Sequence, residues 1–217
     1  RVGKIYLEIA GGSWWQRQLH IAHLDIINPQ ITWRPGLQLP QPLRQLQVDD
    51  LTIDKLQLRW PEGSLQDGAL HLTNWHPIRD GELIPLADVS FDASIGQLQY
   101  AAFRAGKTRM QGALNAKQLN IEELESNIFH GAAAARLNWD LNKNQLIFRE
   151  LALANWQLDL QTLPAVTPRL PNLSAEQVSL ENVSAIDLSR RFALNQVSGS
   201  LENLQWQPGQ LPTFEYQ

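Results

Sequence analysis

The five histidines are the side chains of this chain best suited to bind a metal or move a proton. His20 and His23 are three residues apart, a spacing that in a regular strand places them on opposite faces and prevents chelation of one ion. The other three are His71, His76 and His130, and none has an acidic residue at a fixed ligand spacing. Because the chain also has no cysteine, we expect no metal site.

The acidic residues form no pattern that suits catalysis. The adjacent pairs Asp49-Asp50 and Glu122-Glu123 would direct their side chains apart in an extended chain. The sequence has no phosphate-binding loop, dinucleotide fingerprint, nucleophile elbow or zinc-protease motif, and Gly11-Gly12-Ser13 is typical of a turn. We therefore expect a protein that is not an enzyme and that needs no cofactor.

The composition is that of a folded protein with a mildly acidic surface. The chain has 217 residues, of which 43% are hydrophobic, and a formal net charge of −4, which argues against nucleic acid as a partner. The absence of cysteine excludes disulfides. No apolar run reaches the roughly 18 residues of a membrane-spanning helix. Because the chain begins at Arg1 and not at Met, we expect a processed chain or a fragment that has lost its targeting segment.

The stretch that must position any site is 43–60, LRQLQVDDLTIDKLQLRW. Apolar residues alternate within its short pieces, which predicts strands with one apolar face. Two polar residues separate the pieces, at Asp49-Asp50 and at Asp54-Lys55, and an unbroken strand would turn the next apolar set to the opposite face. One face therefore stays apolar only if each polar pair forms a β-bulge or a two-residue turn.

A similar pattern recurs along the chain, often with asparagine as the second polar residue, as in 24–29, 70–75 and 151–156. Asparagine tolerates positive φ and can bond to the neighbouring backbone, so it suits a bulge or a tight turn. The copies are irregularly spaced, which argues against a strict solenoid repeat. The asparagines predicted at bulges or turns are Asn28, Asn74, Asn155, Asn182 and Asn203.

These patterns predict an all-β fold with minor helix, in the form of a strongly bent antiparallel sheet, taco-like or groove-forming, with repeated β-bulges. Segment 119–129 suits a strand slightly better than a short helix, and 105–107 predicts a hairpin connection. We expect residues 1–163 to form the main curled segment, 164–172 a proline-rich connection, and 173–217 further strands of the same architecture.

The apolar face itself is the remaining candidate for a site. Periodicity alone favours an ordinary core, filled by its own side chains, over a groove that the sheet leaves open. The residues predicted to line such a groove are Leu46, Val48, Leu51, Ile53, Leu56, Leu58, Trp60, Leu70, Leu72, Trp139, Leu151, Leu153, Trp156 and Leu158.

Three blocks of the chain resemble the AsmA-like family of Gram-negative bacteria. They are LRQLQVDDLTIDKLQLRWPEGSLQDGALHLTNW at 43–75, IFHGAAAARLNWDLNKNQLIFRELALANWQLDL at 128–160, and LSAEQVSLENVSAIDL at 173–188 with its partner 192–206. Such proteins carry tandem amphipathic strands, a strand and turn that bear tryptophan, and an aromatic-x-Gly block. Here His130-Gly131 stands where that block usually has two glycines, and the N-terminal membrane helix is missing.

The resemblance implies a bent β-sheet with an apolar trough, lying in the periplasm and anchored to the inner membrane by a segment outside this chain. It also implies a non-enzymatic role in binding or conducting phospholipid acyl chains between the inner and outer membranes, which supports outer-membrane integrity. Burial of each methylene contributes roughly 0.8 kcal/mol, so a trough a few strands long could hold much of one acyl chain. Ile53→Asp or Trp156→Glu should then abolish lipid retention while the domain stays folded.

Two other classes of function remain open. One is a structural or interaction module that adds its edge strands to envelope proteins and assists outer-membrane protein assembly. The other is a closed β-barrel that binds a small apolar ligand. A long unprotected edge strand with self-association would favour the first class, and a sealed interior with one cavity would favour the second.

Overall fold

The computed structural model describes residues 1–13, 16–32, 45–79, 82–83, 88–100, 103–115, 117–128, 130–159, 171–187, 192–206 and 213–216. This part of the chain contains fifteen β-strands and no helix. The all-β prediction is therefore confirmed, and the prediction of minor helix is wrong for the residues described.

The chain divides into two compact units. Unit 1 comprises Arg1–Leu98 and Gln111–Ala116, and unit 2 comprises Gln99–Met110 and Lys117–Gln217. The strands before the division are β1 (Lys4–Ser13), β2 (Gln18–Ile27), β3 (Gln30–Thr32), β4 (Gln45–Trp60), β5 (Gly63–Arg79), β6 (Glu82–Leu83) and β7 (Val89–Tyr100). Strand β8 (Phe103–Leu114) contributes to both units, and so does β7, whose last two residues belong to unit 2. The strands of unit 2 are β9 (Gln118–Ile128), β10 (Gly131–Asp140), β11 (Gln145–Ala154), β12 (Gln157–Asp159), β13 (Asn172–Asp187), β14 (Phe192–Trp206) and β15 (Thr213–Tyr216).

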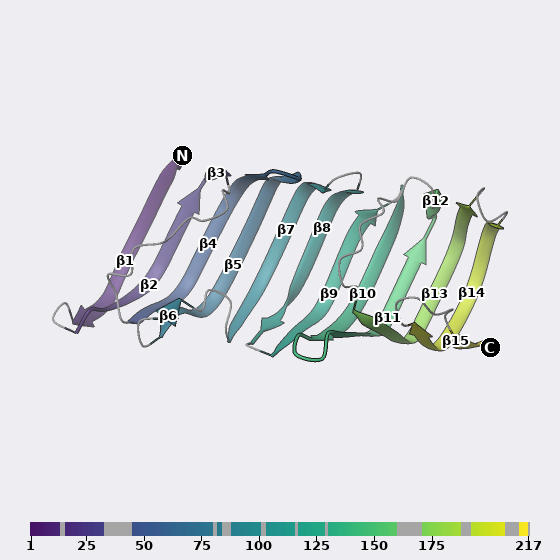
Figure 1. Ribbon diagram of the computed structural model, residues 1–217. Helices are drawn as coiled ribbons and strands as arrows, with labels where there is room; N and C mark the ends of the chain where they lie inside the picture. The colour runs from purple at the N-terminus through teal and green to yellow at the C-terminus, as the bar shows by residue number, and fades with distance from the viewer. Residues whose placement is uncertain are drawn as a thin grey trace. The chain divides into compact units, whose positions relative to one another are not determined.

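Each unit is built on a mixed sheet. In unit 1 the strand order is β1-β2-β4-β5-β7, and in unit 2 it is β9-β10-β11-β13-β14-β15 (Figure 1). Strands β2 and β3 pair with β4 in parallel, and β11 and β12 pair with β13 in parallel. The prediction of a purely antiparallel sheet is therefore wrong. Parallel neighbours need a crossover connection between them, and the chain makes these connections through 33–44 and 160–171.

The two parallel pairs belong to two copies of one arrangement. The β2–β4 pairing starts with Gln18 opposite Gln45, and the β11–β13 pairing starts with Gln145 opposite Asn172. Each residue of the second pair therefore lies 127 positions after the corresponding residue of the first pair. Both pairings continue for ten positions along the strands without a register shift. Residues 4–60 and 131–187 thus repeat the order hairpin, interrupted strand, crossover and parallel strand.

The strands of unit 1 bend together at a position that we call the first bend. It consists of Ala22-His23 on β2, Asp49-Asp50 on β4 and Thr73-Asn74 on β5, two residues between flanking apolar positions on each strand. Because the extra residue is present on all three strands, their register is unbroken there, and the same face stays apolar on either side.

The second polar pair of the same stretch forms a β-bulge. Ile53 pairs with Leu70 and Leu56 pairs with Gly68, so β4 has one residue more than β5 over this interval. Lys55 has a φ of 56°, the left-handed conformation that a bulge residue often adopts. The polar pair Asp54-Lys55 therefore lets β4 change direction while Leu56 remains on the apolar face.

The five asparagines predicted at bulges or turns all have positive φ, between 51° and 57°. Asn155 and Asn182 lie beside each other on the neighbouring parallel strands, and Asn182 Nδ2 donates a hydrogen bond to Asn155 Oδ1 at 2.8 Å. At the equivalent place in unit 1, Asn28 N donates to Asp54 O at 2.8 Å. Neighbouring parallel strands therefore bend at matching positions, as the coils of β-solenoids do. Within each unit the strands are therefore arranged as in a β-solenoid, and the prediction of a taco-like or groove-forming sheet is wrong. The irregular spacing of the asparagine pattern in the sequence had argued against a strict solenoid repeat.

Three local predictions have clear outcomes. Segment 119–129 lies in strand β9 as far as Ile128. The predicted hairpin at 105–107 is wrong, because these residues lie inside β8 and Lys107 has a φ of 44°. Most of the predicted connection 164–172 lies outside the described residues, and β13, which follows it, pairs with β11 inside unit 2.

The buried core of unit 1 lies on the apolar face beside the first bend. Its members are Ile21, Val48, Leu51, Leu72 and Val89, with exposed fractions between 0% and 6%. Partly buried side chains pack around them, namely Leu19, Leu24, Ile26, Leu46, Ile53, Leu70, Trp75, Phe91 and Leu114.

Candidate functional site

The apolar face of unit 1 is made of rows that run across the strands. In one row Leu7, Leu24, Leu51 and Leu72 are successive register partners from β1 to β5. The neighbouring rows are Ile5–Ile26–Ile53–Leu70 and Ile9–Ile21–Val48–Trp75. No charged residue belongs to these rows, so the face offers dispersion contacts and no hydrogen-bonding side chain apart from the Trp75 indole.

Unit 2 carries rows of the same kind. One contains Ile121, Leu137, Phe148, Ala175 and Leu204, from β9 to β14. The next contains Leu124, Ala135, Leu151, Val178 and Leu201. The apolar face is thus duplicated along with the strand arrangement that carries it.

The predicted lining residues divide into a buried and an accessible group. Val48, Leu51 and Leu72 are 0%, 2% and 4% exposed, so a ligand cannot reach their side chains without displacing their neighbours. The side chain of Leu158 lies outside the described part of the chain. The others are half-buried, namely Leu46, Ile53, Leu56, Leu58, Trp60, Leu70, Trp139, Leu151, Leu153 and Trp156.

Ile53 and Trp156 are less suitable for testing a ligand role than the sequence indicated. Ile53 packs against the buried core, so Ile53→Asp would place a charge there and destabilise unit 1. Trp156 Nε1 donates a hydrogen bond to Ala132 O at 2.8 Å, and Trp156→Glu would remove it. Leu58 is outside the core cluster and half-buried, so its substitution tests the face more directly.

The rows of unit 1 end at β1 with exposed apolar side chains. Ile5, Leu7 and Ile9 are 59%, 52% and 60% exposed. In unit 2 the corresponding rows pass through Ala133, Ala135 and Leu137 of β10, which are buried. Strand β9 pairs with the other edge of β10. The apolar face is therefore open to solvent at β1 and covered at the equivalent strand β10.

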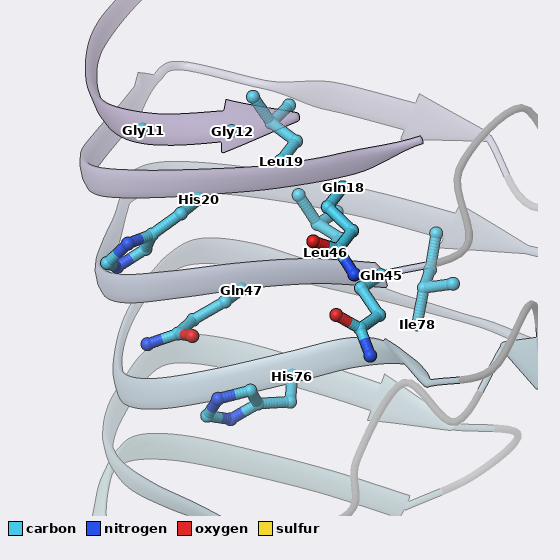
Figure 2. A pocket seen from close by; sticks show the side chains of 10 residues that line it. All are labelled: Gly11, Gly12, Gln18, Leu19, His20, Gln45, Leu46, Gln47, His76 and Ile78. Carbon is cyan, nitrogen blue, oxygen red and sulfur yellow. The ribbon is translucent and has the colours of Figure 1, made fainter. Parts of the chain in front are cut away.

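A pocket of about 570 Å³ adjoins one end of these rows in unit 1. Figure 2 shows its lining, in which Leu19, Leu46 and Ile78 belong to one apolar row and His20, Gln47 and His76 come from three neighbouring strands. Neither a carboxylate nor a Lys or Arg side chain lines it. The complete lining is Gly11, Gly12, Gln18, Leu19, His20, Gln45, Leu46, Gln47, His76 and Ile78.

Histidines and aspartates gather at the first bend, on the side of the strands opposite the apolar rows. The nitrogen–oxygen distances are 2.7 Å for His20 Nε2 to Asp49 Oδ2 and 3.1 Å for His71 Nε2 to Asp50 Oδ2. His23 contacts two carboxylates, with Nε2 2.9 Å from Asp25 Oδ1 and Nδ1 3.3 Å from Asp50 Oδ1. A hydrogen bond from Gln47, followed by one from His20, lowers the pKa of Asp49.

This network was missed in the sequence because the first bend was not visible on β2. His20 and His23 were predicted on opposite faces, which is wrong: the extra residue at Ala22 returns both side chains to the polar side. The sequence did contain a signal for this bend: two residues separate the apolar Ile21 and Leu24, just as two residues separate Val48 and Leu51 on β4. Among the described residues no group of three or more His, Cys, Asp or Glu side chains is arranged to hold a metal ion.

Comparisons of the chain with protein-family models, with curated proteins and with solved structures found no match. Within the described residues there is no helix with the length and apolar character needed to cross a membrane. The apolar face, the pocket and the polar network are therefore the features of the molecule that bear on its function.

Proposed function

We propose that the apolar face binds lipid acyl chains, and that this chain is a non-enzymatic periplasmic segment that conducts phospholipid between the inner and outer membranes. The observation that carries the proposal is the set of apolar rows with accessible side chains. An acyl chain has no polar atoms and can lie across such rows without leaving a hydrogen-bonding group unsatisfied. Each methylene that it buries contributes roughly 0.8 kcal/mol.

The pocket at the end of the rows supports a phospholipid over a wholly apolar ligand. Glutamine amides and histidine imidazoles that line the pocket can hydrogen-bond to a headgroup, and Leu19, Leu46 and Ile78 of one apolar row line it as well. The bends keep the apolar rows on one face over the length of each strand.

Photo-crosslinking from two adjacent positions of β4 tests this proposal. A photoreactive amino acid replaces either Leu58, on the apolar face, or Gln57, which is exposed on the opposite face. In a bacterial envelope that contains radiolabelled phospholipid, we expect a lipid adduct from position 58 and little from position 57. Equal labelling, or the absence of a lipid adduct at both positions, would contradict the proposal.

Strand addition is a second candidate function, and the exposed apolar residues of β1 favour it. The occupant would be an antiparallel strand of an envelope protein, taking beside β1 the place that β9 takes beside β10. A photoreactive residue at Leu7 then crosslinks to a protein, whereas lipid binding alone predicts a phospholipid adduct there.

A further inference from the structure

The imidazole of His23 is held between two carboxylates of different strands. Asp25 lies on its own strand, β2, and Asp50 lies on β4, at 2.9 Å and 3.3 Å from the two ring nitrogens. A neutral imidazole has only one N–H, so its other nitrogen would direct a lone pair at a carboxylate. The contact with Asp25 is a hydrogen bond and the one with Asp50 is an ion pair, and both are favourable together only for the positively charged imidazolium.

Asp50 connects this imidazole to the next strand. Its Oδ2 faces His71 Nε2 of β5 at 3.1 Å. Its Oδ1 is enclosed and makes no hydrogen bond within the described structure, and His23 Nδ1 lies 3.3 Å from it. An enclosed carboxylate oxygen is costly unless a positive charge or a donor faces it.

We propose that His23, Asp50 and His71 form a pH-sensitive clamp that fastens β2, β4 and β5 at the first bend when His23 is protonated, and that loosens when His23 loses its proton. The charged groups facing His23 are Asp25 on β2, Asp50 on β4 and Glu8 on β1, its register partner, with His71 of β5 on the far side of Asp50. The apolar rows lie on the other side of the same bend, so the clamp controls how firmly that part of the face is held.

The surroundings of His23 set the direction of the effect. The hydrogen bond to Asp25 raises its pKa above the ordinary value of 6.5, partial burial opposes the rise, and the charges of Asp25, Asp50 and Glu8 add to it. A group with a raised pKa in the folded state contributes its full stabilisation below the unfolded value. That contribution is lost as the pH rises through the folded pKa, so the clamp fails on the alkaline side.

Unit 2 provides a control within the same molecule. At the spacing of 127 residues, Glu150 stands in place of His23 and Gln177 in place of Asp50. Arg136 Nη1 lies 3.5 Å from Glu150 Oε1, so an ion pair without a histidine occupies this position in unit 2. The strands of unit 2 should therefore show no comparable response to pH.

Hydrogen exchange tests the proposal directly. Amide protection is measured at about pH 5.5 and about pH 8, the range in which histidine titrates, with correction for the intrinsic exchange rate. We expect protection around Ala22-His23, Asp49-Asp50 and Thr73-Asn74 to fall at the higher pH, while β11 and β13 keep theirs. His23→Gln should abolish this difference, whereas His130→Gln, in unit 2, should leave it unchanged.

Two results would overturn the clamp. One is a fall in protection at the first bend that is no larger than that of unit 2, or that persists in His23→Gln. The other comes from an NMR titration of the wild-type imidazole rings, which does not depend on any variant folding. If the pKa of His23 in the folded protein is no higher than in the urea-unfolded chain, the two carboxylates do not favour the imidazolium form, and the clamp is refuted.

Discussion

Asn182 allows the backbone requirement of the bends to be separated from their side-chain contacts. Its φ is 51°, and its side-chain Nδ2 donates a hydrogen bond to Asn155 Oδ1 at 2.8 Å. Asn182→Ala and Asn182→Gly both remove the amide group, and with it a hydrogen bond worth about 0.5–1.5 kcal/mol. Only alanine retains a Cβ, which costs about 1–2 kcal/mol in the left-handed region.

Glycine loses more conformational entropy on folding than alanine, by roughly 0.5–1 kcal/mol, and this partly offsets its advantage. The two terms leave Asn182→Ala less stable than Asn182→Gly by about 1 kcal/mol. Asn127 on β9 is exposed and is not among the positive-φ residues, so there the order should reverse, with glycine less stable by about 0.5–1 kcal/mol.

The free energies of unfolding come from urea denaturation of the four variants and the wild type, with equal slopes required for comparison. The sign of the difference between alanine and glycine is the decisive quantity. If alanine is the more stable substitution at both positions, positive φ does not determine the bend at Asn182, and the account of the asparagine pattern is wrong.

Two further substitutions test the packing around the strands of unit 2. A Cβ at Gly131 would meet the backbone of Ala154, so Gly131→Ala should destabilise the protein by about 1–3 kcal/mol. Gly11→Ala should have little effect, because its Cβ enters open space. If thermal denaturation shows equal losses of stability for the two variants, the predicted clash at Gly131 is wrong. The hydroxyls of Thr108 and Ser126 are buried and 2.6 Å apart, so Thr108→Val alone should cost about 1–3 kcal/mol by leaving Ser126 unsatisfied. Adding Ser126→Ala should recover part of that loss, and strictly additive losses would contradict a coupled pair.

The sequence predicted the faces of the strands well because alternation is a local property. Two polar residues between apolar pieces required a bulge or a bend, and Asp54-Lys55 forms a bulge for that reason. The same reasoning could not identify the pairing partners. Alternation determines which side of a strand is apolar, but it is the same for parallel and antiparallel neighbours, so the parallel β2–β4 and β11–β13 pairs were not predicted.

The polar network was less accessible to sequence reasoning than the apolar face. Ala22 carries no polar side chain, so the bend on β2 lacked the signal that marked β4, and His23 was predicted on the wrong face. The internal duplication was equally hidden, since its 127-residue spacing preserves strand positions and apolar character more than residue identity. Burial of Val48, Leu51 and Leu72 depends on side chains contributed by several strands, which no local pattern reports.

Native mass spectrometry with organic extraction, applied to the protein purified from a bacterial envelope, tests the central proposal most directly. The account predicts co-purified phospholipid that Leu58→Asp releases and that Gln57→Asp, on the opposite face of the same strand, retains, with both variants folded by circular dichroism. A wild-type protein that is monodisperse and free of lipid would contradict it, and would mean that the apolar face is filled by its own side chains.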